Sequence, residues 1–307
     1  MSITLAGMEL KGPVMNAAGT CKTIEDVERL LSAEVSAVVV GSITVSMRPG
    51  NAGTTYWFGS FHALNSRGLP NPGFEDYRRM LPDMVHLAHL RGKKLIVSVA
   101  GLKPGEWRQL TEMSYEAGAD LVELNLGCPN VWGDSGQKRI VCFDPHMVAA
   151  VLEEVESVAS ERGVAVKISP FSDPFGLEEL AGLLKTRKIV KVVTTSNTFP
   201  NGFGVNDAGK PLITATGTNG LAGVSGKALK PIAMGQVRQL VALLPPTIQV
   251  IGVGGIETGR DVYDYLQAGA TAVQIGTAFA ARGGGVFDTV ANQMCAENVW
   301  RAVAASA

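Results

Sequence analysis

The octapeptide ELNLGCPN, residues 123–130, ends an apolar run and then places one thiol between two asparagines. Cys128 lies between Asn125 and Asn130, and a cysteine thiolate can take a proton near neutral pH where its surroundings favour the charged form. A lone cysteine is more often an inert core residue. A strand that only filled a core would not need this cluster of polar groups at its exit, so the motif favours a working base.

Two glycine-rich stretches late in the chain indicate a site for an anion. GVGGIETG places Gly254 and Gly255 after one apolar run, and QIGTAF places Gly276 and Thr277 after the next. Exposed backbone N–H groups attract phosphate, and glycine lets the phosphate approach them. Either stretch alone is explained by a tight turn, but the two together favour a phosphate site. GVGG does not match the six-residue dinucleotide fingerprint.

The elements that must position these residues form a repeated alternation. Eight short β-rich runs, most of them continuously apolar as in parallel strands buried on both faces, alternate with helical patterns. Residues 1–307 are therefore predicted to form a single (β/α)8 TIM barrel domain, with a doubly wound sheet as the alternative. The predicted strands are 13–16, 37–42, 94–99, 120–125, 164–169, 190–195, 248–252 and 271–276, and the predicted helices are 23–33, 75–90, 106–117, 144–163, 177–187, 231–243, 258–268 and 286–303.

Ligand chemistry in such a barrel gathers where the strands end. Polar residues follow most of the predicted strands, and they include Asn16, Ser42, Asn125, Lys167, Asn197 and Thr198. Two connections, 43–73 and 196–229, are longer than ordinary loops of this fold and are expected to carry function over the C-terminal face. The sequence leaves open whether the segment 127–144 moves over the site.

Composition argues against several classes of protein. The chain has 27 basic and 28 acidic residues, a net charge of −1, so no basic field indicates a nucleic-acid or acidic-membrane partner. No apolar run reaches the roughly 20 residues of a membrane span. The four cysteines are widely spaced and no metal-type cluster occurs, so no metal site is expected. Few cysteines and no signal peptide favour a soluble protein in the cytoplasm.

Several stretches together resemble the class 1 dihydroorotate dehydrogenases. They are MNAAGTCKTIEDVE, LNSRGLPNPG, ELNLGCPN, VKISPF, SGKALKP, GVGGIETG and QIGTAF, which cover nearly the whole chain in the family's order. The resemblance implies an FMN-binding (β/α)8 barrel that oxidises dihydroorotate to orotate. It also implies that Gly254, Gly255, Gly276 and Thr277 hold the FMN phosphate, and that Ala18, Ser42, Asn125, Lys167, Ser196 and Gly226 line the rest of the FMN site.

The same resemblance implies the substrate contacts and the chemistry. Cys128 would remove a proton from substrate C5 while hydride leaves C6 for flavin N5, and a second substrate would reoxidise the flavin. Lys167 would lie near the N1/O2 edge of the flavin, where a cation stabilises negative charge. Asparagine amides offer both a donor and an acceptor to a planar ring. The substrate-binding positions implied are Asn65, Asn125, Asn130, Asn197 and Thr198, with the backbone around Gly68 and Leu69 meeting the substrate carboxylate.

The electron acceptor and the assembly stay open. One class 1 subclass is a homodimer that reduces fumarate, and another needs an iron–sulfur partner chain. TIEDVERL looks like the first subclass and SGKALKP somewhat like the second. A homodimer is the simpler expectation, with fumarate as one candidate acceptor.

Two positions depart from the family pattern. Gly41 stands where the family has a lysine that contacts flavin and substrate, and Arg67 stands where the fumarate-using enzymes usually have methionine. One hypothesis is that Arg67 supplies a replacement cation near the substrate carboxylate, since guanidinium suits a carboxylate. The alternative is that Arg67 points to solvent. The departures also leave open a flavin oxidoreductase for another dihydropyrimidine or cyclic amide, or a flavin-binding protein without turnover.

Overall fold

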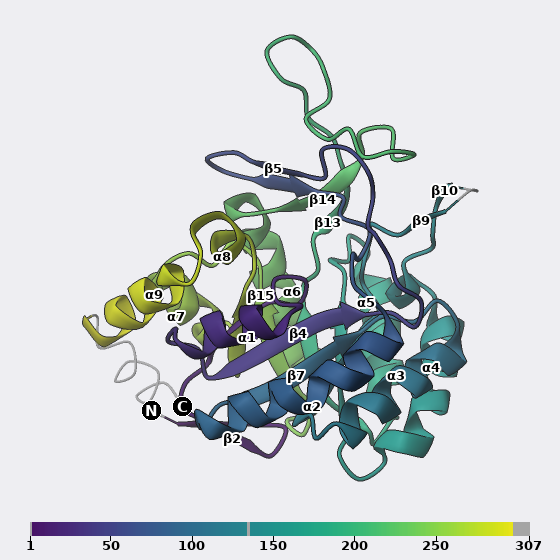
Figure 1. Ribbon diagram of the computed structural model, residues 1–307, viewed down its shortest axis with the longest axis vertical. Coiled ribbons are helices and arrows are strands. Elements are labelled where there is room, and N and C mark those ends of the chain that lie inside the picture. Colours follow the sequence, from purple (N-terminus) through teal and green to yellow (C-terminus); the bar gives the residue numbers. More distant parts are fainter. Residues whose placement is uncertain (1, 134–135, 297–307) are drawn as a thin grey trace.

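A computed structural model describes residues 2–133 and 136–296, and eight parallel strands close into a barrel at its centre (Figure 1). The strands follow one another around the barrel in chain order, and the last pairs with the first. The predicted (β/α)8 architecture is confirmed, and the doubly wound alternative is excluded. The barrel strands are β3 (Val14–Asn16), β4 (Ala37–Ile43), β7 (Lys94–Val99), β8 (Leu121–Asn125), β11 (Val164–Ile168), β12 (Val190–Thr195), β15 (Gln249–Val253) and β16 (Ala272–Ile275).

Helices surround the barrel, and their apolar faces pack on its outer surface. Helix α1 begins with a capping box, because Thr23 accepts from the Asp26 backbone N–H and Asp26 accepts from the Thr23 backbone N–H. The helices are α1 (Ile24–Leu31), α2 (Phe74–Leu90), α3 (Pro104–Glu116), α4 (Pro145–Ala159), α5 (Pro174–Leu184), α6 (Lys230–Leu243), α7 (Gly259–Gln267), α8 (Thr277–Arg282) and α9 (Gly285–Ala296). Part of the last predicted helix, 297–303, lies outside the described residues.

The barrel interior is a second, separate apolar core. All eight barrel strands contribute to it, for example through Met15, Val39 and Ile251. A hairpin that the sequence did not predict, β1 (Ile3–Leu5) and β2 (Met8–Leu10), adds Leu5, Met8 and Leu10 to this core. The hairpin thus closes one end of the barrel, and its polar backbone is tied to β15 through the Gln249 side chain.

A four-stranded antiparallel sheet covers the opposite end of the barrel (Figure 1). The two long connections supply it, with β5 (Tyr56–Phe58) and β6 (Ala63–Asn65) from the first and β13 (Phe199–Gly202) and β14 (Ala222–Ser225) from the second. We call these four strands the cover sheet. A small core of its own, including Leu64, Ile213 and Ala222, holds the two connections together. The predicted loops are therefore ordered structure above the C-terminal strand ends.

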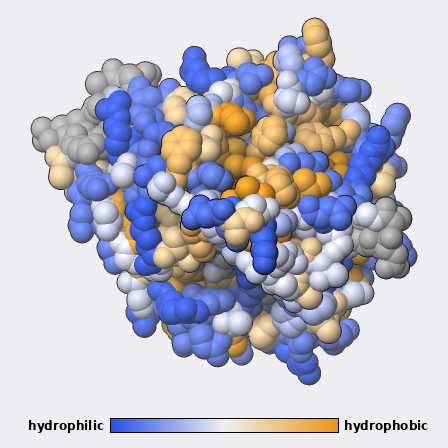
Figure 2. Space-filling model, turned by 90° about the horizontal axis from the view of Figure 1, so that it is seen from above, coloured by the Kyte–Doolittle hydropathy of each residue, from blue (hydrophilic) through white to orange (hydrophobic). Residues whose placement is uncertain are grey.

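Two smaller features complete the fold. A short hairpin, β9 (Trp132–Gly133) and β10 (Gly136–Gln137), follows the Cys128 motif, and 3-10 turns η1 (Val141–Phe143) and η2 (Lys227–Leu229) precede α4 and α6. None of the described helices is long and apolar enough to cross a membrane. Seen from the cover-sheet side, apolar surface gathers near the middle of the face within a mostly hydrophilic surround (Figure 2).

Candidate active site

One cavity of about 620 Å³ lies between the carboxyl ends of the barrel strands and the cover sheet. Its volume is in the range of cofactor and small-ligand sites. Every residue that the sequence singled out for cofactor, substrate or catalysis lines it, so positions from seven barrel-strand ends and both long connections meet there. These residues are Ala18, Ser42, Asn65, Arg67, Gly68, Leu69, Asn125, Cys128, Asn130, Lys167, Ser196, Asn197, Thr198, Gly226, Gly254, Gly255, Gly276 and Thr277.

Cys128 lies just past β8, half-buried in the cavity wall. Burial raises the pKa of its thiol above the ordinary value, and this outweighs the opposite influences of the Asn130 backbone N–H and of the positive charges on Arg48, Lys167 and Lys22. Cys21 and Cys142 are fully buried, and burial raises the pKa of each thiol as well. Of these three cysteines, only Cys128 combines cavity access with nearby cations.

The asparagines form two hydrogen-bonded groups in the cavity. Asn197 donates to the Asn125 amide oxygen at 2.8 Å, and Asn125 donates to Ser42 Oγ at 2.7 Å. Asn130 donates to Asn65 Oδ1 at 2.9 Å, which joins the Cys128 loop to the cover sheet. These bonds fix the amide orientations and leave Asn130 and Asn197 each with further bonding capacity. Thr198 Oγ1 is buried without a hydrogen-bond partner, so a ligand could satisfy it.

Lys167 belongs to a buried polar group inside the barrel mouth. Its Nζ donates to Gln274 Oε1 at 2.9 Å and lies 3.8 Å from Glu123 Oε1, while Gln274 Nε2 donates to Glu123 Oε2 at 2.9 Å. Burial lowers the pKa of Lys167, and the Glu123 charge acts against that lowering. Glu123 Oε1 has no hydrogen bond of its own. The Lys167 ammonium group therefore has the Glu123 carboxylate on one side and the cavity on the other.

The two glycine-rich loops, at Gly254–Gly255 and at Gly276–Thr277, expose backbone N–H groups to the cavity, and we call them the glycine cradle. Neither Gly255 nor Gly276 donates its N–H to another described group. Gly255 has φ +64°, and a Cβ there would lie 2.9 Å from the Gly226 carbonyl oxygen, so the close approach of the two loops requires glycine at position 255. Thr277 Oγ1 donates to Ser225 Oγ at 2.9 Å. The donor set fits a phosphate, and the predicted FMN is therefore compatible with the residues present.

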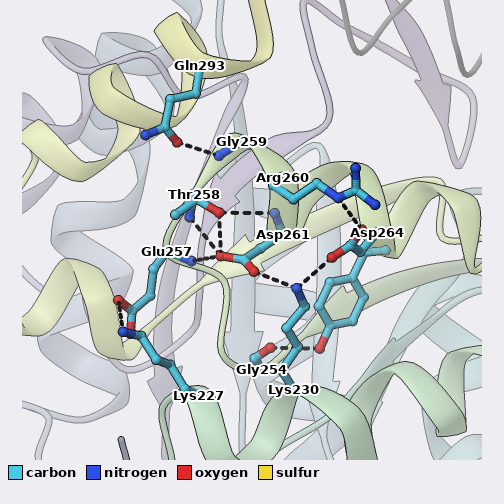
Figure 3. A network of polar contacts seen from close by, with 11 residues as sticks. Lys227, Lys230, Gly254, Glu257, Thr258, Gly259, Arg260, Asp261, Asp264 and Gln293 are labelled. Atoms are coloured by element: carbon cyan, nitrogen blue, oxygen red, sulfur yellow. Dashed lines mark hydrogen bonds and ion pairs between the residues drawn. The ribbon is translucent and has the colours of Figure 1, made fainter. Parts of the chain in front are cut away.

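Helices α6 and α7 are tied together behind this cradle (Figure 3). Lys230 Nζ contacts Asp261 at 2.5 Å and Asp264 at 2.7 Å, and Tyr265 donates to the Gly254 carbonyl at 2.7 Å. Burial opposes the charge on Lys230, but the two carboxylates more than offset it and raise the pKa of the ammonium group. Asp261 also completes a capping box with Thr258. These contacts hold the Gly226 and Gly254 loops at a fixed separation.

Gly41 has a backbone that excludes a lysine. Its φ is +106°, and a Cβ there would lie 2.2 Å from the Ser98 carbonyl oxygen. Its N–H donates to the Cys21 carbonyl at 3.0 Å, and its own carbonyl accepts from the Gly19 N–H at 2.5 Å. The backbone at position 41 thus requires glycine in place of the family lysine, and the segment 19–22 packs against it.

Arg67 does not point away into solvent. It is half-buried, lines the cavity and donates from Nη1 to the Gly19 carbonyl at 2.9 Å. Sequence reasoning missed Lys22, which also lines the cavity, and the buried partners Glu123 and Gln274. Lys22 lies within the motif MNAAGTCKTIEDVE, directly before Thr23, the N-cap residue of α1, and a cation in a loop after a strand was the signal available.

Comparison with protein families gives a match over almost the whole chain. The model of the family described as dihydroorotate dehydrogenase matches residues 1–297. Dihydroorotate dehydrogenase A (fumarate) of Lactococcus lactis subsp. cremoris strain MG1363 is 31% identical over 296 residues, covering 96% of this chain and 93% of that protein. Dihydroorotate dehydrogenase (fumarate) of Lachancea kluyveri is 30% identical over 296 residues, with coverage of 96% and 92%.

A solved structure has the same fold. The dihydroorotate dehydrogenase of Eimeria tenella, crystallised in complex with ferulenol, superposes with a TM-score of 0.79 at 20% identity and covers 95% of this chain and 83% of that one. At this identity the likeness concerns the fold alone. The family match, the relatives and the barrel agree with one another: this chain belongs to the dihydroorotate dehydrogenase family of oxidoreductases acting on CH–CH bonds.

Proposed function

We propose that this protein is an FMN-dependent dehydrogenase that oxidises dihydroorotate to orotate. The observation that carries the proposal is the convergence of Cys128, the asparagine pairs, Lys167 and the glycine cradle on one cavity. Bound FMN would supply a hydride acceptor. Its phosphate would be held by Gly254, Gly255, Gly276 and Thr277, and its remaining groups by Ala18, Ser42, Asn125, Lys167, Ser196 and Gly226.

The chain's own residues bind and orient the ring. Asn65, Asn130 and Asn197 carry amide groups that can pair with ring C=O and N–H groups, and Thr198 Oγ1 gains the partner that it lacks in the protein alone. Asn125, held by Ser42 and Asn197, adds a further amide. The backbone of Gly68 and Leu69, with the Arg67 guanidinium beside them, faces the substrate carboxylate. The ring is thereby held in one orientation against Cys128.

Cys128 moves the proton. As thiolate it takes a proton from C5 of dihydroorotate, and bound FMN would accept the hydrogen at C6 as hydride, so that the C5–C6 single bond would become the double bond of orotate. Lys167, with Glu123 beside it, places a positive charge on the cavity wall, where it would stabilise negative charge that develops on bound FMN. The buried thiol then returns its proton to solvent.

The electrons are proposed to leave to fumarate, because the similar proteins from Lactococcus lactis and Lachancea kluyveri carry fumarate in their names. We further propose a homodimer in the cytoplasm. The four cysteines are all free thiols, as a reducing compartment would keep them, and Phe58, Phe61 and Phe203 are exposed on or beside the cover sheet, where a second copy could bury them.

A steady-state assay tests this function. FMN-loaded protein given dihydroorotate and fumarate should release orotate, detected by its ultraviolet absorbance, and Cys128→Ala should abolish release while FMN stays bound. A second candidate, oxidation of another dihydropyrimidine or cyclic amide, is favoured by the backbone at Gly41, which cannot carry the family lysine. Orotate release that is absent with every acceptor tried, from a protein that holds FMN, would favour that candidate.

A further inference from the structure

Three cations on one side of the cavity lack a carboxylate partner. Lys22 and Arg67 line the cavity, and Arg48 is close enough for its charge to act on Cys128. Within residues 2–133 and 136–296, no ion pair involves any of the three. Lys167 and Lys230 differ, because each of them faces a carboxylate. The positive charge in this part of the cavity is therefore not neutralised by the protein.

Each of the three cations instead contacts a backbone carbonyl. Lys22 donates to Pro70, Arg48 Nε donates to Gly68 at 2.9 Å, and Arg67 Nη1 donates to Gly19 at 2.9 Å. An ammonium group has three N–H donors and a guanidinium has five, so donors remain on each side chain. Lys22 and Arg67 thus link two segments in both directions. Lys22, in segment 19–22, donates to Pro70, and Arg67, in segment 67–70, donates to Gly19.

The backbone around Lys22 is held from several sides. Its N–H donates to Asp26 Oδ2 at 2.9 Å, and its carbonyl accepts from the Tyr77 hydroxyl at 3.1 Å. The preceding residues pair with Gly41, whose bare Cα allows the close approach. The same glycine that removes a lysine from β4 thus helps to position a different lysine at the cavity.

The surroundings of Lys22 disfavour its charge while the cavity holds no anion. Burial lowers the pKa of the Lys22 ammonium to about 7, and the positive charge of Arg67 adds to this effect, against smaller opposing influences of Asp26 and Cys128. The Asp26 carboxylate does not serve as its ion-pair partner, because it accepts from two backbone N–H groups of the helix cap and from Arg29. An anion bound between Lys22 and Arg67 would remove this cost.

We propose that Lys22 and Arg67 form an anion-holding pair, and that the ring oxidised beside Cys128 must carry a carboxylate placed between them. Lys22 is then a specificity-determining residue that takes over the charge absent at Gly41. The proposal rests on the proposed function only for the position of the ring. A neutral ring would leave both cations desolvated and unpaired, and sites of this kind discriminate strongly against a ligand that lacks the matching group.

Ligand titrations of the FMN-loaded protein test the pair. Binding of orotate, and of uracil as its neutral analogue without the carboxylate, is followed by the change in flavin absorption. Lys22→Met should weaken orotate binding by about tenfold or more and leave uracil binding within about twofold, as expected for loss of one charge-assisted contact. Lys22→Arg should retain most of the orotate affinity, and Lys185→Met, an exposed lysine at the end of α5, serves as the control.

Two results with the Lys22→Met variant would overturn the proposal. One is an orotate affinity unchanged by Lys22→Met, and the other is an equal loss for orotate and uracil, which would mean that Lys22 only supports the loop. A wild-type protein that binds uracil as tightly as orotate would also contradict it.

A second measurement does not depend on the substrate or on FMN. The rates at which iodoacetate and iodoacetamide alkylate Cys128 are compared by peptide mass analysis, and their ratio cancels any change in thiolate fraction. Lys22→Met should lower the ratio for the anionic reagent several-fold, and Lys185→Met should not. If Lys22→Met lowers the iodoacetate/iodoacetamide ratio but dihydroorotate does not reduce the flavin of the wild-type protein, the anion-holding pair stands and the proposed substrate is rejected. If Lys22→Met leaves the ratio unchanged, the pair itself is rejected.

Discussion

Cys128 combines two opposing features at the scale of a single residue. Burial raises the pKa of the thiol, while three cations and the Asn130 backbone N–H favour the thiolate. The sequence predicted a base from the neighbouring asparagines, and in the structure burial outweighs the cations, so that the pKa of the Cys128 thiol is raised. The thiolate fraction therefore grows as pH rises through the raised pKa.

We expect the rate of proton abstraction to follow that fraction. Because the pKa of Cys128 is raised, kcat/KM for dihydroorotate should rise with pH across the neutral and mildly alkaline range and level off only above the pKa. Cys128→Ser should lower kcat by about 10²–10⁴-fold and remove this rise, since a hydroxyl does not ionise there. Rapid-mixing measurement of flavin reduction at several pH values gives the profile. A profile that is flat in the wild-type protein would contradict the assignment.

Glu123 is a buried residue whose removal should lower the stability of the protein strongly. It is fully buried, its charge faces Lys167 at 3.8 Å, and the two share Gln274. Glu123→Leu leaves a buried ammonium without a counter-charge and should destabilise the protein by about 3–5 kcal/mol. Chemical denaturation of the FMN-loaded protein measures the change.

The double variant Glu123→Leu with Lys167→Met distinguishes the loss of the ion pair from the loss of side-chain packing. It removes both charges and should recover much of the lost stability. Glu153→Gln, on the exposed face of α4, should stay within about 0.5 kcal/mol of the parent protein. If the double variant is no more stable than Glu123→Leu, the loss comes from packing and not from the ion pair.

At the scale of elements, the strand ends and the glycine-rich loops position the residues that line the cavity. Lys230 links α6 to α7, so it sets the distance between the Gly226 and Gly254 loops (Figure 3). Lys230→Met should weaken FMN binding by about tenfold, which corresponds to ~1.4 kcal/mol. Arg260→Met removes the exposed partner of Asp264 and a contact with the Tyr263 ring, and it should change FMN affinity less than twofold. Fluorescence titration of apoprotein with FMN measures both, and equal effects would mean that the loops are held by other contacts.

Strand β4 supplies a test of the departure at Gly41. Gly41→Lys, which restores the family residue type, should destabilise the protein and not improve substrate binding, because the new Cβ meets the Ser98 carbonyl oxygen. Gly209→Ala, at φ +72° with open space around it, carries the backbone strain without the contact and should cost only about 1 kcal/mol. Thermal unfolding compares the two. A Gly41→Lys protein as stable as the parent, with tighter orotate binding, would contradict this account.

The elements also show what a single sequence can predict. All eight barrel strands were predicted within two residues of their ends, because buried parallel strands are continuous apolar runs. The β1–β2 hairpin and the cover sheet were not predicted. Their strands are only three or four residues long and are stabilised by partners distant in the sequence, as when β6 pairs with β14. Local pattern carries no information on such pairing.

The residues that the sequence singled out line one cavity, because the strand ends of a barrel meet on one side. Lys22 escaped prediction because only the packing of segment 19–22 on Gly41 brings its side chain to the cavity. Glu123 and Gln274 escaped for a different reason. Each lies inside a barrel strand, where the sequence alone does not tell which face looks into the barrel.

For the whole molecule, the central claim is that one cavity holds FMN and oxidises a carboxylate-bearing dihydropyrimidine. The most direct test is anaerobic mixing of the yellow, FMN-loaded protein with dihydroorotate and, separately, with dihydrouracil. We predict that dihydroorotate bleaches the flavin absorbance within one turnover and that dihydrouracil does so far more slowly. Flavin that stays oxidised with dihydroorotate, or that dihydrouracil bleaches equally fast, would contradict the account.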